Sequence, residues 1–256
     1  MIGAGIDAGS RAIKVALYDD ERDTVVATDV LDQGVEQVAL AKGLFEKLLE
    51  DNGLDRGNVS RVVGTGYGRS ILDFVDSTIT EITCHARGVR RVSPGARTII
   101  EIGGQDSKLI RLNPEGAVRD FAMNDRCAAG TGRFLEMVAA RLDVPLEKLG
   151  ELARGSHSPA PISSMCVVFA ETEIIGLLAS GSAPEDIVAG VQTAIVKRVA
   201  AMAGRTMDEP VSFTGGVAMV PGMVEALQDA LGRPVSVATD PQMTGAVGAS
   251  LLAANR

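Results

Sequence analysis

The segment Ile6-Asp7-Ala8-Gly9-Ser10, which precedes Lys14, has a counterpart later in the chain in Ile102-Gly103-Gly104-Gln105-Asp106-Ser107-Lys108. Each segment follows a short apolar run and leads into a second, so each predicts a β-hairpin with a glycine turn. A third strand-like run follows each hairpin. The expected strands are Ile2–Asp7, Ala12–Asp19 and Thr24–Leu31 in the first copy and Thr98–Ile102, Lys108–Leu112 and Ala117–Met123 in the second. Two three-stranded starts, each followed by helices, predict two similar α/β lobes.

The turn Ser93-Pro94-Gly95 is the expected boundary between these lobes. Lobe I therefore covers residues 1–93, and lobe II covers residues 94–243. We expect the C-terminal helix, residues 244–256, to return to lobe I and complete it. Helical periodicity predicts further helices at residues 35–50, 81–92, 145–154, 166–179, 184–207 and 221–231, and strands at 59–65, 211–214 and 235–238.

Glycine-rich turns that follow strands are typical of phosphate sites, because their backbone N–H groups can approach an anion closely. Two such turns facing each other across a cleft would hold a triphosphate, and Gly215-Gly216 forms a third turn after a strand. Asp7 and Asp106 would support Mg²⁺, directly or through water, and Lys14 would neutralise phosphate charge. Either hairpin alone is common in ordinary proteins. Together the three turns favour a nucleotide cleft.

The stretch Met123–Leu142 carries Cys127 next to two glycines and an apolar stripe at helical spacing. Asn124 or Asp125 is a good helix N-cap, so we expect Cys127 in or beside the first turn of a helix. Such a helix start binds phosphate, but helix N-termini also favour thiolates. We expect Ser163 and Ser164 to cap a second helix, which begins near Cys166.

The remaining cysteine and the two histidines carry no expected ligand role. Cys84 lies within a predicted helix without a glycine turn, so we interpret it as a core thiol. The sequence has no C-x-x-C pair, and His85 and His157 lie far apart, which argues against a zinc site in one chain. We expect both histidines at the surface or as capping residues. We assign no role to Glu171 or Glu173.

Composition narrows the functional classes. The 256 residues carry a net charge of −8, contain no Trp and only two Tyr, and so lack the basic footprint and aromatic platform of a nucleic-acid-binding protein. No apolar run is long enough to cross a bilayer. An odd, scattered set of three cysteines and the absence of a basic n-region predict a cytoplasmic protein without a signal peptide.

The three glycine motifs resemble those of the actin, sugar-kinase and heat-shock-chaperone superfamily of ribonuclease-H-like ATPases. In this resemblance Gly5-Ile-Asp7-Ala-Gly9-Ser10 is similar to the first phosphate motif and Glu101-Ile-Gly103-Gly104-Gln105-Asp106 to the second. Phe213-Thr-Gly215-Gly216-Val217-Ala218 is similar to the adenosine motif. The resemblance spans nearly the whole chain and implies two ribonuclease-H-like lobes around a nucleotide cleft.

Within that superfamily the chain resembles the ATPase activators of 2-hydroxyacyl-CoA dehydratases and the ATP-binding subunits of benzoyl-CoA reductase. Four segments carry this resemblance: Gly103–Lys108, Asn124–Gly132, Met165–Glu173 and Pro241–Gly248. The two cysteine-bearing segments are specific to this branch. The resemblance implies a homodimer with one [4Fe–4S] cluster between its subunits. It also implies a dehydratase or reductase as the electron acceptor, and a ferredoxin or flavodoxin as the donor.

The chemistry of the residues agrees with this implication. A [4Fe–4S] cluster takes four thiolates, and a two-fold axis would double Cys127 and Cys166 to four. We expect Asp106 to orient the attacking water or the metal and Gln105 to position it. The expected ligands of ATP or ADP are Asp7, Gly9, Ser10, Lys14, Gly103, Gly104, Gly215, Gly216 and Gln242.

Two other functions remain open at this point. A small-molecule kinase on the same fold would need a carboxylate to deprotonate its acceptor hydroxyl. Asp73 and Asp76 are available for that role, but a kinase leaves both cysteine segments without a purpose. The second alternative is a non-catalytic nucleotide sensor that binds ATP without rapid turnover.

Overall fold

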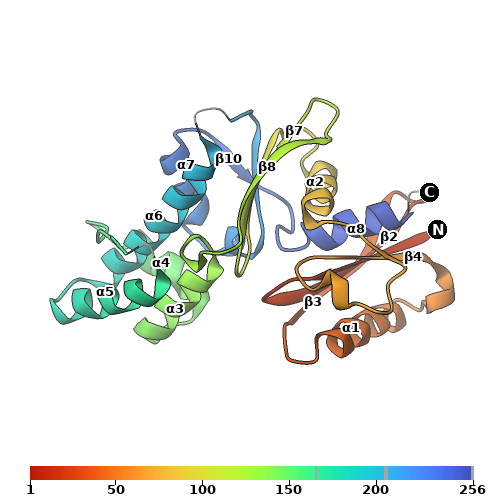
Figure 1. The fold of residues 1–256 in the computed structure, drawn as a ribbon, viewed down its shortest axis with the longest axis horizontal. Helices are drawn as coiled ribbons and strands as arrows, with labels where there is room; N and C mark the ends of the chain where they lie inside the picture. Colours follow the sequence, from red (N-terminus) through yellow and green to blue (C-terminus); the bar gives the residue numbers. More distant parts are fainter. Residues whose placement is uncertain (165, 205–206, 255–256) are drawn as a thin grey trace. The chain divides into compact units, whose positions relative to one another are not determined.

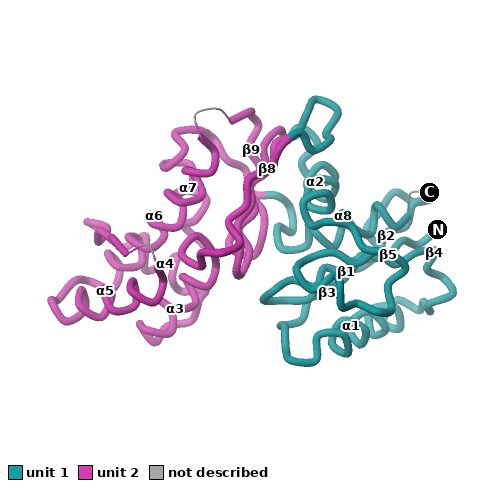
Figure 2. The backbone as a smooth tube through the Cα atoms, in the orientation of Figure 1, with its two compact units in different colours: residues 1–96, 112–119, 238–256 teal, residues 97–111, 120–237 magenta. Residues whose placement is uncertain are grey.

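The computed structural model describes residues 1–164, 166–204 and 207–254. Residue 165, part of the Met165–Glu173 segment, and residues 205–206 and 255–256, at the ends of two expected helices, lie outside the described residues. The chain forms two compact units (Figures 1 and 2). Unit 1 comprises Met1–Ala96, Leu112–Arg119 and Ala238–Arg256, and unit 2 comprises Arg97–Arg111 and Asp120–Val237. No helix of the described residues is long and apolar enough to span a membrane.

Unit 1 contains a mixed five-stranded sheet with helices on both faces. Its strand order is β3-β2-β1-β4-β5, in which β1 is antiparallel to β2 and parallel to β4. The apolar side chains of β1 and β2 alternate, so that one face packs on α1 and the other on α8. The elements are β1 (Ile2–Ala8), β2 (Ala12–Asp19), β3 (Thr24–Asp32), α1 (Gln37–Asp51), β4 (Val59–Thr65), β5 (Ser77–Thr78), α2 (Glu81–Val92) and α8 (Thr244–Ala254).

Unit 2 repeats this sheet topology. Its strand order is β10-β9-β6-β7-β8, in which β6 is antiparallel to β7 and parallel to β9. Its core joins apolar residues of β6 and β9 to α3 and α6. The strands are β6 (Thr98–Ile102), β7 (Ser107–Leu112), β8 (Val118–Asn124), β9 (Val211–Thr214) and β10 (Val235–Val237). The helices are α3 (Gly132–Leu142), α4 (Leu149–Arg154), α5 (Val167–Ala179), α6 (Pro184–Ala203) and α7 (Met223–Leu231).

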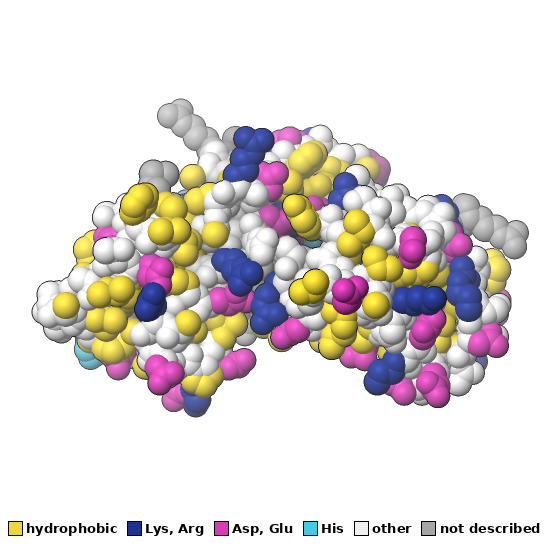
Figure 3. Space-filling model, turned by 60° about the horizontal axis from the view of Figure 1, so that its bottom comes forward, with side chains coloured by type: hydrophobic (Ala, Val, Ile, Leu, Met, Phe, Trp, Pro, Cys, Tyr) yellow, Lys and Arg dark blue, Asp and Glu magenta, His cyan; other side chains and the backbone are white. Residues whose placement is uncertain are grey.

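Most expected elements occur at the expected places, and the differences have local causes. The helix expected to reach Met207 ends at Ala203, because Gly204 adopts a positive φ of 64° and terminates it. The segment after Pro145 starts as a 3₁₀ turn, Leu146–Lys148, before α4 begins. On the face of the molecule in Figure 3, basic and acidic side chains of both signs are interspersed with apolar ones.

Candidate functional site

Each unit places a carboxylate opposite a lysine on its first antiparallel strand pair. Asp7 of β1 pairs in register with Lys14 of β2, and the Lys14 Nζ lies 2.9 Å from Asp7 Oδ2. In unit 2, Glu101 of β6 pairs in register with Lys108 of β7, and Lys108 Nζ lies 2.7 Å from Glu101 Oε2. The acid precedes the lysine by the same spacing in both units. All four side chains are buried or nearly so, which strengthens both ion pairs.

A glycine with positive φ completes each of these arrangements. Asp7 pairs with Thr65 on parallel strand β4, and Glu101 pairs with Thr214 on β9. Gly66 and Gly215 follow these threonines with φ of 87° and 90°. A Cβ at Gly66 would lie 2.3 Å from Asp7 Oδ1, and a Cβ at Gly215 would lie 2.7 Å from Glu101 Oε1. Glycine is therefore required at both positions by conformation and by space.

This geometry corrects the alignment of the two repeats. The sequence pattern alone aligned the segment from Ile6 to Ser10 with the segment from Ile102 to Ser107. The strand register instead makes Glu101 the counterpart of Asp7, and Asp106 an additional carboxylate on the turn. Asp106 Oδ2 lies 2.8 Å from Lys108 Nζ, so Lys108 is held between two acids.

The turn Gly103–Asp106 is hydrogen-bonded to the start of α3. The turn closes with a bond from Gly103 N to Asp106 O of 3.0 Å. The N–H groups of Gly132 and Arg133 donate to the carbonyls of Gly103 and Gly104, both at 2.9 Å. These two N–H groups are consequently used inside the protein, so the helix start is not the phosphate site that its glycines suggested. Gln105 is exposed at the tip of the turn.

The other expected nucleotide ligands lie in turns at strand or helix ends. Gly9 and Ser10 connect β1 to β2, and a Cβ at Gly9 would come within 2.8 Å of Lys14 Nζ. Gly216 is exposed at the start of a 3₁₀ turn, Gly216–Met219, directly after Gly215. Gln242 is half-buried in the turn that precedes α8. These residues belong to the termini of elements, where backbone groups can reach a ligand.

His85 is buried beside Asp7, contrary to the expectation that it lies at the surface or caps a helix. Its side chain is 6% exposed on α2, and Nδ1 lies 3.0 Å from Thr244 Oγ1 of α8. A Cβ at Gly245 would lie 2.9 Å from Asp7 Oδ2 and 3.3 Å from His85 Nε2. The imidazole and the Asp7 carboxylate therefore flank the same glycine.

Cys127 does not lie in the first turn of α3, and neither Asn124 nor Asp125 caps that helix. Cys127 precedes a 3₁₀ turn, Ala128–Gly130, and Thr131 is the N-cap of α3. Asn124 instead fixes the cysteine backbone from both sides: Asn124 Nδ2 donates to Cys127 O at 2.8 Å, and Cys127 N donates to Asn124 Oδ1 at 3.1 Å. The glycine-rich sequence folds first as an Asx-type turn.

Cys166 is the N-cap of α5, as expected, but Ser163 and Ser164 do not cap the helix. Their N–H groups both donate to the carboxylate of Glu173, at 2.9 Å each, and Ser163 Oγ donates to it at 2.7 Å. Burial of this carboxyl opposes its ionisation, but the hydrogen bonds from the two serines outweigh it and lower the pKa of Glu173 to about 2. Glu173 therefore holds the backbone of Ser163 and Ser164, a role that its sequence position did not indicate.

The three thiols differ in exposure. Cys166 is exposed, Cys127 is half-buried, and Cys84 is fully buried as expected. Burial raises the pKa of the Cys84 thiol to about 12. Cys127 and Cys166 are therefore the two thiols that solvent and a ligand can reach.

Comparison with known proteins decides the family. The model of the BadF/BadG/BcrA/BcrD ATPase family matches residues 4–253. The chain belongs to this ATPase family. It is 43% identical over 254 residues to the activator of lactoyl-CoA dehydratase from Anaerotignum propionicum, covering 99% of this chain and 97% of the relative.

Solved structures agree with this assignment. The activator of the 2-hydroxyisocaproyl-CoA dehydratase from Clostridium difficile, with bound ADPNP, matches with a TM-score of 0.93 and 40% identity, covering 99% of this chain and 94% of that one. A ROK family glucokinase from Streptomyces griseus matches with a TM-score of 0.59 at 16% identity, covering 98% of this chain and 90% of that one. The second likeness concerns the fold alone. The expected fold class and the resemblance to dehydratase activators are confirmed.

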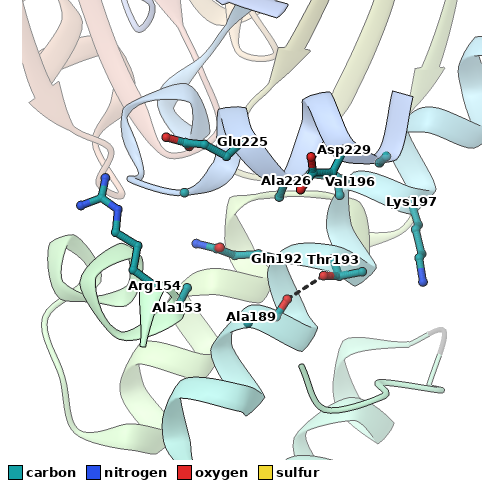
Figure 4. Close-up of a pocket in the computed structure, with 12 residues that line it drawn as sticks. Ala153, Arg154, Ala189, Gln192, Thr193, Val196, Lys197, Glu225, Ala226 and Asp229 are labelled. Atoms are coloured by element: carbon teal, nitrogen blue, oxygen red, sulfur yellow. Dashed lines mark hydrogen bonds between the residues drawn. The ribbon is translucent and has the colours of Figure 1, made fainter. Parts of the chain in front are cut away.

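In this member of the family, a pocket of about 400 Å³ lies in unit 2 among α4, α6 and α7 (Figure 4). Gln192 of α6 lines it and donates through Nε2 to Pro221 O at 3.1 Å. A Cβ at Gly150 of α4 would lie 2.3 Å from the same carbonyl. Two helices of this ATPase thus hold the loop that follows Gly215-Gly216, but the pocket contains none of the expected site residues.

Asp76, a candidate base for a kinase of this fold, is engaged in structural bonds. Its carboxylate accepts from Arg56 Nη2 at 2.8 and 3.1 Å and from Val62 N at 2.7 Å. These bonds hold the Asp76 carboxylate against Arg56 and the backbone of β4.

Sequence reasoning assigned no role to several residues that take part in the contacts described above: Glu101, Lys108, His85 and Glu173. One signal was available for the first two, since an acid seven residues before a lysine occurs at both glycine turns. The others contact residues far away in sequence. Their partners depend on the tertiary fold and leave no local pattern.

Proposed function

We propose that this chain is an ATP-hydrolysing, homodimeric electron-transfer activator with one [4Fe–4S] cluster shared between two copies. It would deliver a low-potential electron to a 2-hydroxyacyl-CoA dehydratase or a related reductase, with a ferredoxin or flavodoxin as donor, in the cytoplasm. The observation that carries this proposal is the connection between one phosphate turn and one cysteine segment: Gly103 and Gly104 accept hydrogen bonds from the start of α3, directly after the Cys127 turn.

The residues suit a Mg²⁺-nucleotide. The turns at Gly9-Ser10, Gly103-Gly104 and Gly215-Gly216 would supply backbone N–H groups, and Gln242 a side-chain amide. Among the described residues no three His, Cys, Asp or Glu side chains form a metal-binding group. Asp7 and Asp106 would therefore support Mg²⁺ together with phosphate oxygens and water, as this ion prefers. Asp106 would orient the attacking water, with Gln105 beside it.

The residues also suit a cluster shared by two chains. Each chain offers two accessible thiols, Cys127 and Cys166, whereas Cys84 is buried with a raised pKa. The segments that carry both thiols contact α6 of the same unit, through Gly130 and Ser164. Two chains would supply the four thiolates that a [4Fe–4S] cluster takes. When bound, the cluster would supply a one-electron carrier of low potential.

Lactoyl-CoA and 2-hydroxyisocaproyl-CoA dehydratases are the partners named for the two relatives described above. Both relatives align over nearly the whole of this chain, which supports a partner of the same class. The shared motifs do not select one acyl-CoA substrate.

Anaerobic purification followed by iron analysis tests the proposal. We expect about four iron atoms per dimer, a reduced-cluster magnetic resonance signal that changes between ATP and ADP, and no iron in the double variant Cys127→Ser/Cys166→Ser. A colourless protein that phosphorylates a metabolite would establish the kinase alternative, and a colourless protein with slow ATP turnover would establish the sensor. A full complement of iron in the double variant would refute the ligand assignment.

A further inference from the structure

Arg198 of α6 binds the segment that carries Cys166, and α6 also packs on the 3₁₀ turn Ala128–Gly130 that follows Cys127. Its Nη2 donates to Ser164 O at 3.0 Å, and its Nη1 donates to Ala194 O of the same helix at 3.0 Å. On its other side, a Cβ at Gly130 would lie 3.6 Å from Arg198 Cβ, an ordinary van der Waals contact. The guanidinium of this half-buried side chain therefore binds the Cys166 segment, and its stem lies close to Gly130 of the Cys127 segment.

Glu173 binds the N–H groups of the residues that precede Cys166, whereas Arg198 binds a carbonyl there. Its two carboxylate oxygens accept from the N–H groups of Ser163 and Ser164, while Arg198 binds the carbonyl of Ser164. The peptide groups around Ser164 are thus held through both their donor and their acceptor. These bonds involve charged groups, which makes them stronger than neutral ones.

Residues 158–164 have no regular secondary structure, so these side chains supply the hydrogen bonds that a ladder would otherwise provide. A loop without such bonds would sample many conformations, and the thiol that follows it would move with it. On the Cys127 side, Asn124 provides the equivalent backbone bonds, and its Nδ2 lies 3.2 Å from the position of a Cβ on Gly130.

We propose that Arg198 and Glu173 are positioning residues that hold the Cys127 and Cys166 segments in a fixed relation before any cluster binds. The proposal rests on the proposed function for its purpose, but the clamp itself is a property of the metal-free chain. A preorganised pair of thiols would bind its ligand without first ordering a loop, and would retain it longer.

The first test measures amide hydrogen exchange in the metal-free protein. We expect Glu173→Gln to raise the exchange rates of Ser163 and Ser164 about tenfold, the size expected of a lost hydrogen bond to a charged group. The matched control is Glu171→Gln, which removes a carboxylate from the same helix that pairs instead with Arg141 of α3. Equal exchange at Ser163 and Ser164 in both variants would overturn the clamp.

The second test uses the iron-loaded dimer. We expect Arg198→Gln and Glu173→Gln to shorten the half-time of iron loss to a chelator about tenfold and to shift the reduction potential, while the thermal unfolding midpoint falls by only about 2–4 °C. The control for Arg198 is Lys197→Gln, because Lys197 is its exposed neighbour. Arg198→Lys keeps the charge and should recover part of the retention. Iron loss and potential that match the controls would contradict the positioning role.

The two proposals fail in distinguishable ways. A wild-type protein that takes up no iron would refute the proposed function, and the exchange experiment on the metal-free chain would still decide the clamp. Normal iron content with exchange equal to the controls would refute the clamp and leave the proposed function standing.

Discussion

The glycine turns of the two units share a strand register but differ in what holds them. In unit 1 the carbonyl of Gly9 accepts from the side-chain amide of Gln33, at 2.8 Å. In unit 2 the carbonyls of Gly103 and Gly104 accept from main-chain N–H groups at the start of α3. A side-chain tether can be lost without moving a helix, whereas a main-chain tether couples the turn to the helix itself. If the nucleotide binds as proposed, the unit 2 turn is therefore the better placed to transmit a change at the nucleotide to the Cys127 segment.

The acid–lysine pairs of the two units also differ, in the exposure of the lysine and in the number of its carboxylate partners. Lys14 is paired with Asp7 and retains 14% side-chain exposure, whereas Lys108 is 2% exposed and lies between Glu101 and Asp106. A second carboxylate anchors the unit 2 turn from its tip. The turn of unit 2 thus carries one more ion pair, at a more deeply buried lysine, than the turn of unit 1.

Replacing the two lysines should break this comparison most strongly. Lys108→Met leaves Glu101 buried without its partner, so we expect a loss of about 3–5 kcal/mol in the free energy of unfolding. Lys14→Met should cost less, because Lys14 is more exposed than Lys108 and pairs with one carboxylate instead of two. Denaturant unfolding of both variants measures the difference. Equal losses would show that the added carboxylate and deeper burial of unit 2 carry no energetic weight.

The two positive-φ glycines that lie beside a carboxylate, Gly66 and Gly215, should respond alike to substitution. We expect Gly66→Ala and Gly215→Ala each to destabilise the chain by roughly 1–3 kcal/mol through backbone strain and displacement of Asp7 or Glu101. Gly181→Ala is the matched control, because Gly181 also has positive φ, at 84°, but meets no atom within 4 Å. Thermal unfolding and ATP affinity report the effect. A site variant no worse than the control would mean that contact with the carboxylate is unimportant.

His85 offers a smaller effect confined to unit 1. Its imidazole bonds Thr244 and flanks the same glycine as Asp7, so His85→Gln should disturb the Asp7 carboxylate without emptying the core. We expect ATPase kcat/KM to fall about tenfold, or about 1.4 kcal/mol. His157→Gln, at an exposed site, serves as the control. Unchanged kcat/KM in His85→Gln would separate the histidine from the site.

The side-chain tether of unit 1 should have the smallest effect. Gln33→Ala removes one partly exposed hydrogen bond to Gly9, and we expect a change of about 0.5–1 kcal/mol in ATP affinity. Isothermal titration with ATP measures it. A loss greater than that of Gly66→Ala would contradict the view that this tether is dispensable.

Repeats, hairpins and strongly periodic helices could be predicted from the sequence, because their signals lie within a few residues. The alignment of the two repeats was wrong, because the sequence pattern matches their glycines, whereas the strand register pairs Glu101 with Lys108 as it pairs Asp7 with Lys14. The caps near the cysteines were also wrong. Asn124, Ser163 and Ser164 have side chains that can cap a helix. In the folded chain Asn124 instead binds the backbone of Cys127, Ser163 binds Glu173, and the carbonyl of Ser164 binds Arg198.

Buried polar contacts could not be predicted for the same reason. His85 meets Thr244 across 159 positions of sequence, and Ser164 meets Arg198 across 34. Nothing local distinguishes such a histidine from one at the surface. The buried cysteine, in contrast, could be distinguished from the other two by local sequence. Cys84 lies within an amphipathic helix, whereas Cys127 and Cys166 follow or precede glycine- or serine-rich turns.

We expect a nucleotide to act on the Cys127 segment through the hydrogen bonds from Gly132 and Arg133 to the Gly103–Asp106 turn. Amide hydrogen exchange of the dimer, compared between ADP and a non-hydrolysable ATP analogue, tests it most directly. We predict that the exchange of Gly132, Arg133 and the Cys127 turn differs between the two nucleotides and that the difference disappears in Asp106→Asn. Identical exchange at these amides with both nucleotides, in a protein shown to bind them, would contradict a coupling of the nucleotide to the Cys127 segment through this turn.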